Sequence, residues 1–181
     1  MEIAKGNIIS ATPFLDDPYF RQAVVLLTEH NDKGSFGFII NRETDLKLHE
    51  LIKDVLFEAS IYYGGPVGNE NLFYIHSLGD LLPNSVEILP GLYWGGEFDV
   101  LKELLNNKEA EPDKVKFFAG YSGWDPEQLA GEFANKAWVA GTTTAGEVLH
   151  TEGYEQHWKK MLRKDKEYAI WSNFTDMPHL N

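Results

Sequence analysis

The sequence predicts an α+β fold, and three observations lead to that class. Short apolar segments separated by turn residues fill the first third of the 181-residue chain, which is typical of strands. Further along, apolar residues recur with the 3.6-residue period of amphipathic helices. Strands and helices do not alternate as regular βαβ units, so the class is α+β or an irregular α/β arrangement.

The N-terminal part is expected to consist of strands. Residues 8–14 form the first one, ended by the turn sequence DDP at residues 16–18. Residues 23–30 (AVVLLTEH) are a continuous apolar run, as expected of a strand buried on both faces. Turn-forming residues at 31–35 precede another apolar run at 36–41, which predicts a β-hairpin.

The rest of the chain mixes helices with short strands. Helices are expected at residues 46–57, 98–107, 125–138 and 152–164. Strands are expected at residues 60–65, 71–77, 86–96, 114–120 and 137–142, and an extended tail at 172–181. The third helix has the strongest signal, since Asp125 suits the N-cap, Pro126 suits the first helical position, and Gln128 completes a capping box. No linker or repeat is found, so residues 1–181 are expected to form a single domain.

The composition indicates an acidic globular protein. The chain carries 16 Lys and Arg against 28 Asp and Glu, a net charge of −12, so direct nucleic-acid binding is not expected. A basic stretch at residues 158–168 leaves a local patch for a partner open. The absence of cysteine excludes disulfides, thiolate catalysis and cysteine-ligated metals. Neither a transmembrane run nor a signal peptide is found, so we expect a cytoplasmic protein that does not bind membranes.

Residues 120–124 (GYSGW) raise the question of whether Ser122 is a nucleophile. A nucleophile elbow has the pattern Gly-x-Ser-x-Gly, because small residues must flank its strained turn. Trp124 stands where that pattern has glycine, and no later histidine carries a triad signature. We therefore expect a structural loop, in which the glycines permit unusual backbone angles and burial anchors Tyr121 and Trp124.

A phosphate site at this loop is also disfavoured. The next helix begins Asp125, Pro126, Glu127, so two carboxylates lie at its positive end and one N–H donor is missing. Residues 62–68 (YYGGPVG) and 93–99 (YWGGEFD) likewise place aromatics beside paired glycines, without the spacing of a nucleotide-binding loop. The three aromatic–glycine segments could instead line a common cleft suited to recognition.

No metal site or cofactor is expected from the histidines. His150 and His157 are seven residues apart, but Gly153 between them marks a helix start, which argues against a shared helical face. Glu29 and His30, at the end of an expected strand, could form an acid–base pair in a cleft. A capping or hydrogen-bonding role for His30 is the simpler interpretation.

The motifs in combination resemble the YqgE/AlgH family of small bacterial proteins. The resemblance rests on residues 16–42 (DDPYFRQAVVLLTEHNDKGSFGFIINR), 62–67 (YYGGPV) and 120–138 (GYSGWDPEQLAGEFANKAW). It extends over roughly residues 6–140, with Glu43 standing where the family often has proline. It implies a bent mixed sheet folded into a pseudo-barrel with helices packed outside, and it implies no established catalytic residue. Some members carry the label of transcriptional regulator.

These observations favour a non-enzymatic binding or regulatory domain. The alternative is a hydrolase or other enzyme that uses Glu29, His30 or Ser122 in a cleft, and direct DNA binding is less favoured still. The partner, a protein or a small molecule, stays open, as does a homo-oligomer. The residues expected to bind it are Gly64, Gly65, Pro66, Tyr121, Ser122, Trp124, His30 and Arg42.

Overall fold

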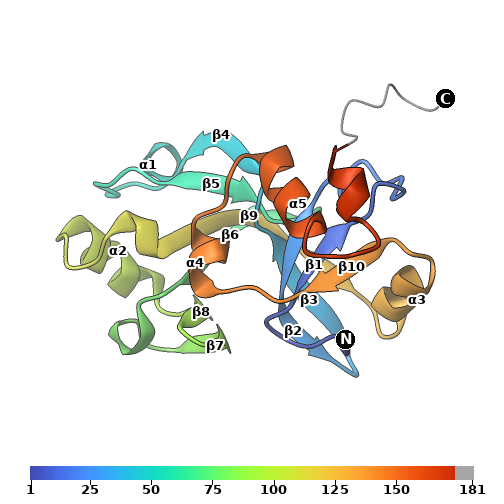
Figure 1. The fold of residues 1–181 in the computed structure, drawn as a ribbon. Helices are drawn as coiled ribbons and strands as arrows, with labels where there is room; N and C mark the ends of the chain where they lie inside the picture. Colours follow the sequence, from blue (N-terminus) through green and yellow to red (C-terminus); the bar gives the residue numbers. More distant parts are fainter. Residues whose placement is uncertain (174–181) are drawn as a thin grey trace.

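The computed structural model describes residues 1–173, which form strands, α-helices and short 3-10 helices (Figure 1). The strands are β1 (Ile8–Ala11), β2 (Val24–Asn31), β3 (Gly34–Ile39), β4 (Glu43–Lys47), β5 (Ser60–Tyr63), β6 (Val67–His76), β7 (Ser85–Leu89), β8 (Leu92–Gly95), β9 (Val115–Trp124) and β10 (Trp138–Gly141). The α-helices are α1 (Leu48–Leu51), α2 (Phe98–Asn106), α3 (Gln128–Ala134), α4 (Ala145–Leu149) and α5 (Tyr154–Leu162). The 3-10 helices are η1 (Gly79–Leu81), η2 (Pro112–Lys114) and η3 (Ala169–Asn173).

The strands form one mixed sheet in the order β10-β1-β2-β3-β9-β6-β8-β7, with β5 joining β4 to β9. β5 runs parallel to β9, and the other pairs are antiparallel. The predicted α+β class is confirmed. The sheet is not closed, because β10 and β7 lie at its two ends and each pairs on one side among the described strands.

The expected bend of the sheet is strong. The rings of Phe36 on β3 and Trp94 on β8 lie 5.6 Å apart, although β9 and β6 separate their strands. The N-terminal segment spans part of the remaining gap. The Gly6 N–H donates to the Leu27 carbonyl (2.8 Å), and Lys5 Nζ donates to the Glu87 carbonyl of β7 (2.9 Å). The sheet therefore resembles an open barrel rather than a flat layer.

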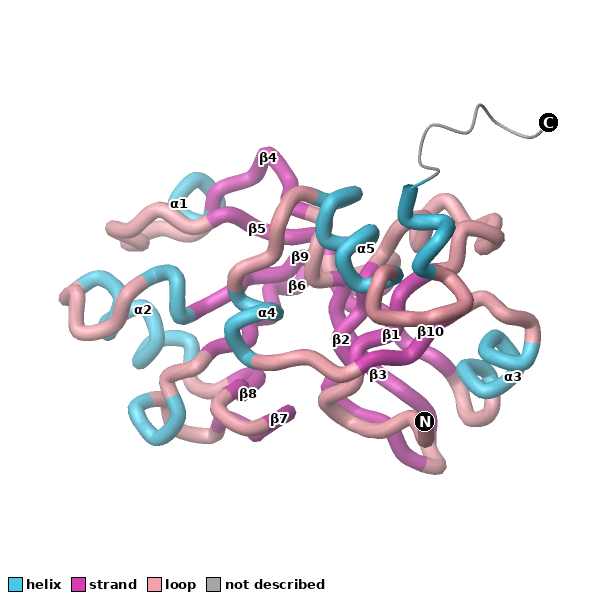
Figure 2. The backbone as a smooth tube through the Cα atoms, viewed as in Figure 1, coloured by secondary structure: helices cyan, strands magenta, loops and turns pink. Residues whose placement is uncertain are grey.

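Alternation along β2 explains why both of its faces are buried. Val24 and Leu26 point into one apolar cluster, which also contains Trp158 and Met161 of α5. Val25 and its odd-numbered neighbours point into a second cluster, which contains Leu129 of α3. Successive strand residues face opposite sides of a sheet, so a continuous apolar run is required when helices cover both sides. Figure 2 shows α5 over the β1–β2 region and α3 beyond β10.

The second predicted helix, α2, is confirmed, and it covers another part of the sheet. Leu101 and Leu105, four residues apart, point into a third cluster with Phe117 of β9. The predicted C-terminal helix is confirmed as α5, with His157, Trp158, Met161 and Leu162 buried. The predicted hairpin at 31–35 is also confirmed, since β2 ends at Asn31 and β3 begins at Gly34. The expected tail lies outside the described residues apart from 172–173.

Two of the expected elements are wrong. Most of residues 46–57 is not helical: β4 pairs with β5, and α1 is a single turn. Leu48 and Val55 are buried in the apolar cluster with Phe117, but Leu51 and Leu56 are 58% and 80% exposed, so the helical spacing predicted only part of the buried face. The segment GYSGW is not a loop, because β9 continues to Trp124 and pairs with β3 along Gly37, Phe36 and Ser35.

The third helix begins later than predicted. Glu127 has a left-handed backbone, with φ of 66°, so α3 begins at Gln128. Half of the expected capping box forms nonetheless, because the Asp125 N–H donates to Gln128 Oε1 (2.9 Å). No helix among the described residues is long and apolar enough to cross a membrane.

Candidate functional site

Two of the three aromatic–glycine segments lie directly against each other. A Cβ on Gly64 would be 2.2 Å from the Gly120 carbonyl, and one on Gly65 would be 2.1 Å from the Tyr121 carbonyl. Glycine is therefore required at both positions, and Pro66 continues this segment towards β6. The sequence left open a common cleft lined by the three segments, and these two instead pack backbone against backbone.

Ser122 takes part in the same contact. Its side chain is fully buried, and its Oγ donates to the Gly64 carbonyl at 3.0 Å. That carbonyl also accepts the Ile39 N–H at 2.8 Å. A nucleophilic serine needs access to substrate and a base as its hydrogen-bond partner. Ser122 is buried and donates to a carbonyl, so its hydroxyl has a structural role.

Four half-buried rings from four strands form what we call the aromatic patch: Phe36 (β3), Phe73 (β6), Trp94 (β8) and Tyr121 (β9). Phe36 is central, with ring centroids 4.5 Å from Tyr121, 5.6 Å from Trp94 and 6.2 Å from Phe73. Tyr121 and Trp94 belong to two of the aromatic–glycine segments. The bend of the sheet brings these rings together.

Exposed side chains extend the aromatic patch. Val67 is the cross-strand partner of Tyr121 and is 43% exposed, and Val86 is the partner of Trp94 and is 49% exposed. Cross-strand partners in an antiparallel pair lie on the same face. By the same rule, the exposed carboxylate of Glu29 lies beside Phe36. The surface is apolar at its centre and carries a negative charge at one side.

The three residues proposed for catalysis do not come together. Glu29 is paired with Phe36 and His30 with Ser35, so the neighbouring side chains point to opposite faces of β2. His30 Nδ1 lies 2.7 Å from Ser35 Oγ, the hydrogen-bonding role that the sequence suggested. Within residues 1–173, none of the side-chain hydrogen bonds joins Glu29, His30 and Ser122 to one another.

Arg42 ties the loop before β2 to α5. Its guanidinium donates to the carbonyls of Tyr19 (2.7 Å) and Arg21 (3.3 Å) and to the Tyr154 hydroxyl. The guanidinium carbon lies 4.8 Å from the ring centroid of Tyr154 and 5.2 Å from that of Tyr63. With these contacts, Arg42 links the loop before β2, β5 and α5.

Trp124 belongs to the core. It is 5% exposed, and its Nε1 donates to Glu132 Oε2 at 2.8 Å. The same carboxylate oxygen accepts a hydrogen bond from Trp138 Nε1 at 2.7 Å. Glu132 on α3 thereby joins the ends of β9 and β10, and Trp124 also lines a hollow of about 210 Å³ together with Glu29 and Phe36.

Sequence reasoning missed Lys116, the one fully enclosed cation of the described residues. It occupies a position on β9 whose neighbour two residues on, Phe118, points into the core. Its Nζ donates to the carbonyls of Ile40 (2.8 Å) and Val148 (3.0 Å) and to Thr151 Oγ1 (2.7 Å). The signal in the sequence was a lysine inside an apolar strand, KVKFFAG, where an apolar residue is expected.

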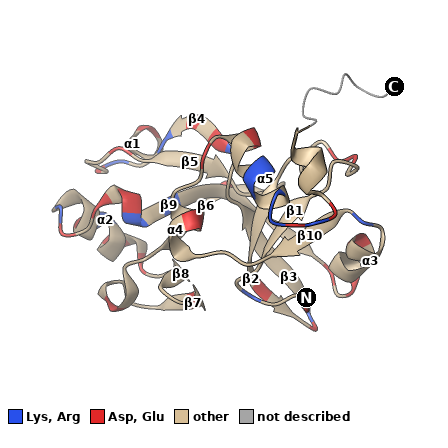
Figure 3. Cartoon of the chain, in the orientation of Figure 1, with Lys and Arg blue, Asp and Glu red and all other residues tan. Residues whose placement is uncertain are grey.

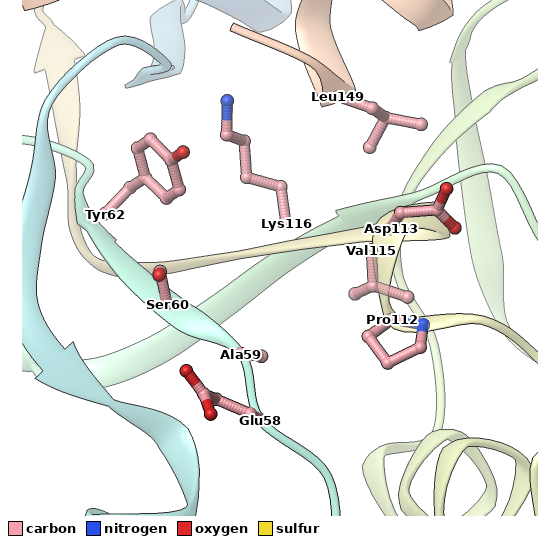
Figure 4. Close-up of a pocket in the computed structure, with 9 residues that line it drawn as sticks. All are labelled: Glu58, Ala59, Ser60, Tyr62, Pro112, Asp113, Val115, Lys116 and Leu149. Atoms are coloured by element: carbon pink, nitrogen blue, oxygen red, sulfur yellow. The ribbon is translucent and has the colours of Figure 1, made fainter. Parts of the chain in front are cut away.

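A small hollow of about 230 Å³ opens beside Lys116, between β5, η2 and the end of α4 (Figure 4). Figure 4 shows the lysine amine beside the ring of Tyr62, whose centroid is 4.1 Å away. Burial lowers the pKa of Lys116 to about 7, and the nearby charge of Glu43 opposes this shift. Burial also raises the pKa of the Tyr62 hydroxyl, against the effect of its hydrogen bond with Thr151.

His157 on α5 is a second buried titratable group on this side of the sheet. Neither of its ring nitrogens has a hydrogen-bond partner among the described residues. Burial and then the positive charges of Lys116 and Lys160 lower the pKa of His157 to about 4. Within residues 1–173 no group of histidines and carboxylates is placed to hold a metal ion.

The basic stretch near the C-terminus is largely compensated. Lys159, Lys160 and Lys164 form ion pairs with Glu155 (2.7 Å), Glu152 (3.2 Å) and Glu147 (2.8 Å), respectively. Figure 3 shows basic positions on α5 with acidic positions close by. Lysines held by carboxylates present little net charge to a phosphate backbone.

The geometry defines a small α+β protein with a packed core and an apolar surface patch. The profile of the AlgH-like family matches residues 8–168, so the chain belongs to that family. A UPF0301 protein of Parabacteroides distasonis is 40% identical over 181 residues, which cover 98% of this chain and 91% of the relative. One from Cytophaga hutchinsonii is 37% identical over 182 residues, covering 99% of this chain and all of the relative.

Solved structures have the same fold. The AlgH protein of Pseudomonas aeruginosa has a TM-score of 0.72 at 25% identity, covering 99% of this chain and 100% of that one. Protein DIP2367 of Corynebacterium diphtheriae has a TM-score of 0.77 at 22% identity, with 95% of this chain and 93% of that chain covered. None of these names describes an activity, so function has to be inferred from this chain's own surfaces.

Proposed function

We propose that this protein is a non-enzymatic, cytoplasmic binding domain with a regulatory role, which recognises a protein partner through the aromatic patch. The observation that carries the proposal is the patch itself, in which rings from four strands share one half-exposed surface. Aromatic side chains are enriched at protein interfaces, since they bury much apolar area at little cost in side-chain entropy.

The chemistry of the patch suggests the kind of partner. Val67 and Val86 widen the apolar centre, so an aliphatic or aromatic side chain fits there. Glu29 lies beside Phe36, and the protein has a net charge of −12. Both features favour a partner that carries a Lys or Arg next to its apolar anchor, because opposite charges accelerate association and orient it.

A binding function is also consistent with the positions of the three residues considered for catalysis. The buried Ser122 and the divergent Glu29 and His30 support no shared reaction centre. The ion-paired lysines of α5 give no support to direct nucleic-acid binding.

A matched pair of variants tests the proposal. Val86→Asp places a carboxylate at the edge of the aromatic patch, and Leu56→Asp places one on an exposed leucine away from it. Proteins retained from a native lysate by the tagged wild type should be lost, by about 10-fold or more, with Val86→Asp and kept with Leu56→Asp.

Thermal melting of both variants should remain close to that of the wild type, because both side chains are exposed. Equal retention by both variants would contradict a role for the aromatic patch. The hypothesis of a non-enzymatic protein would be wrong if the purified protein turned over a substrate and a single polar substitution abolished that turnover.

A further inference from the structure

The outer edge of β10 carries backbone groups without a strand partner. β10 pairs with β1 alone among the described strands. The Ala11 N–H bonds to β2 and the Thr12 N–H bonds to the Ala137 carbonyl, so alternate residues of β1 face alternate neighbours. Continuing that alternation, Val139 and Gly141 bond to β1, and Trp138 and Ala140 direct their N–H and C=O groups outward.

Hollows lie beside this edge on both faces of the strand. The larger, of about 580 Å³, is lined by Trp138 together with Ala130 and Phe133 of the α3 side. The smaller, of about 230 Å³, is lined by Gly141 and by Met161 of α5, among others. Trp138 and Gly141 are three residues apart on a strand, so they face opposite sides of the sheet. Val139 and Ala140 border both hollows.

This combination matches the shape of one added strand. An extended peptide turns successive side chains to opposite faces, so a peptide paired with Trp138 and Ala140 would place neighbouring residues into the two hollows. Main-chain hydrogen bonds would give affinity, and the hollows would select the side chains. Met1 borders both hollows and is 71% exposed, and Ile3 lines the larger hollow, so an entering peptide would displace the exposed Met1.

The walls of the groove favour a peptide over a second copy of the chain. The larger hollow is bounded by α3 and by Glu167 and Tyr168 of the segment after α5, and Figure 1 shows these parts on either side of β10. A single extended peptide needs only the roughly 4.8 Å spacing of paired strands, whereas a second copy would bring its own α3 and its own segment after α5 to the same edge. The smaller occupant is therefore the one favoured here.

The charges around the groove indicate the composition of the peptide. Lys136 is paired with Glu167 (3.5 Å) and Lys164 with Glu147 (2.8 Å), so glutamates already compensate both cations. Asp165, which lines both hollows, adds a further carboxylate, whose Oδ1 also accepts the N–H groups of Glu167 and Tyr168. The groove therefore suits an apolar segment flanked by Lys or Arg, as does the net charge of −12.

We propose that the edge of β10 binds an extended, apolar peptide segment of a partner protein, flanked by basic residues, as an additional antiparallel strand. The proposal goes beyond the aromatic patch, since β10 and β8 lie in different parts of the sheet order. The two proposals are independent, because neither site uses residues of the other.

A display library of random octapeptides, selected on the immobilised full-length protein, supplies the probes. Enriched octapeptides are then synthesised, and their affinities are measured by fluorescence anisotropy for the wild type, Ala140→Pro and Ala140→Ser. Proline removes the outward N–H of residue 140 and serine keeps it, so we expect affinity to fall by about 10-fold or more only with proline. The enriched octapeptides should combine adjacent apolar residues with Lys or Arg.

A second pair of variants leaves the backbone hydrogen-bonding groups of β10 unchanged. Ala130 is exposed and lines the larger hollow, so Ala130→Trp should fill it and weaken the octapeptides, and Ala130→Ser should not. This pair decides the question if melting shows that Ala140→Pro does not fold. Val86→Asp should leave octapeptide binding unchanged, which separates this site from the aromatic patch.

Three results would overturn the proposal. The first is that no octapeptide is enriched, and the second is that Ala140→Pro and Ala130→Trp bind the enriched octapeptides as well as the wild type does. The third comes from sedimentation: a wild-type dimer that becomes monomeric with Ala140→Pro would assign the edge to a second copy of the chain.

Discussion

Ser122 and Lys116 lie on the same strand, β9, and both are buried polar side chains. Ser122 sits in a segment that looks catalytic, GYSGW, yet it makes one neutral hydrogen bond to a carbonyl that has another donor. Lys116 lies in an apolar run that matches no motif, yet its amine donates to three oxygen atoms and lies over the ring of Tyr62. A motif is therefore a weaker guide to unusual chemistry than an ionisable residue at a position that the sheet buries.

The energetic difference follows from charge. A buried hydroxyl is satisfied by one or two partners, whereas a buried ammonium must replace most of its hydration shell. The acceptors around Lys116 come from Ile40 just after β3, from Val148 of α4 and from Thr151, so the amine joins the sheet to the segment that leads into α5. We expect the stability of the protein to be sensitive to substitution of Lys116 and to its titration, and to change little on substitution of Ser122.

Lys116→Ala should produce the largest effect. The substitution leaves a cavity in the place of the aliphatic stem and removes the donor to the Ile40 and Val148 carbonyls, so we expect a loss of about 3–5 kcal/mol of unfolding free energy. Urea denaturation measures it. Lys116→Met is the control: it retains the stem and removes the charge, and should cost clearly less. If Lys116→Ala lost less than about 1 kcal/mol of unfolding free energy, the contacts that surround the Lys116 amine, which we call its cage, would not be important for stability.

The pH dependence of stability should come next in size. The pKa of Lys116 is lowered to about 7 in the folded protein, so between pH 7 and its ordinary value of 10.5 the unfolded chain binds more protons. Stability contributed by this site should therefore rise with pH across that window, by at most about 1.4 kcal/mol per pH unit. Urea denaturation at several pH values should show the rise in the wild type and in Ser122→Ala, and should not show it in Lys116→Met.

His157 should act in the same direction at lower pH. Its pKa is lowered to about 4 from 6.5, so the unfolded chain again binds more protons between these values, and stability should fall as the pH drops from 6.5 to 4. His157→Leu should flatten this acid limb and leave the rise above pH 7 in place. An unchanged acid limb in His157→Leu would show that other groups are responsible.

Ser122→Ala should produce the smallest effect, a loss of about 0.5–1 kcal/mol. The Gly64 carbonyl keeps the Ile39 N–H as a donor, so the substitution leaves no unpaired buried acceptor. Thermal melting with purified protein measures the change. A loss of several kcal/mol would place Ser122 on a par with Lys116 and remove the contrast between the two ends of β9.

Local patterns predicted the elements whose burial depends on nearby residues. The apolar run of β2, the hairpin at 31–35, and the helices α2 and α5 follow from period and turn chemistry. The helix predicted at residues 46–57 is wrong because β4 forms a strand by pairing with β5. Leu48 and Val55 still reach the core, but Leu51 and Leu56 lie in solvent. Periodicity shows where a face could form, but not whether another element covers it.

The sequence by itself determined the class and the acidic character, whereas the need for glycine at Gly64 and Gly65 follows from their contacts with β9. Only the tertiary structure revealed the aromatic patch, the groove at β10 and the cage of Lys116. Each of these joins segments far apart in the chain: the Lys116 amine meets residues 76 and 35 positions away, and Phe36 meets Trp94 across two intervening strands. Such contacts depend on the register and bend of the sheet, which result from all of its strands packing together and not from any one segment.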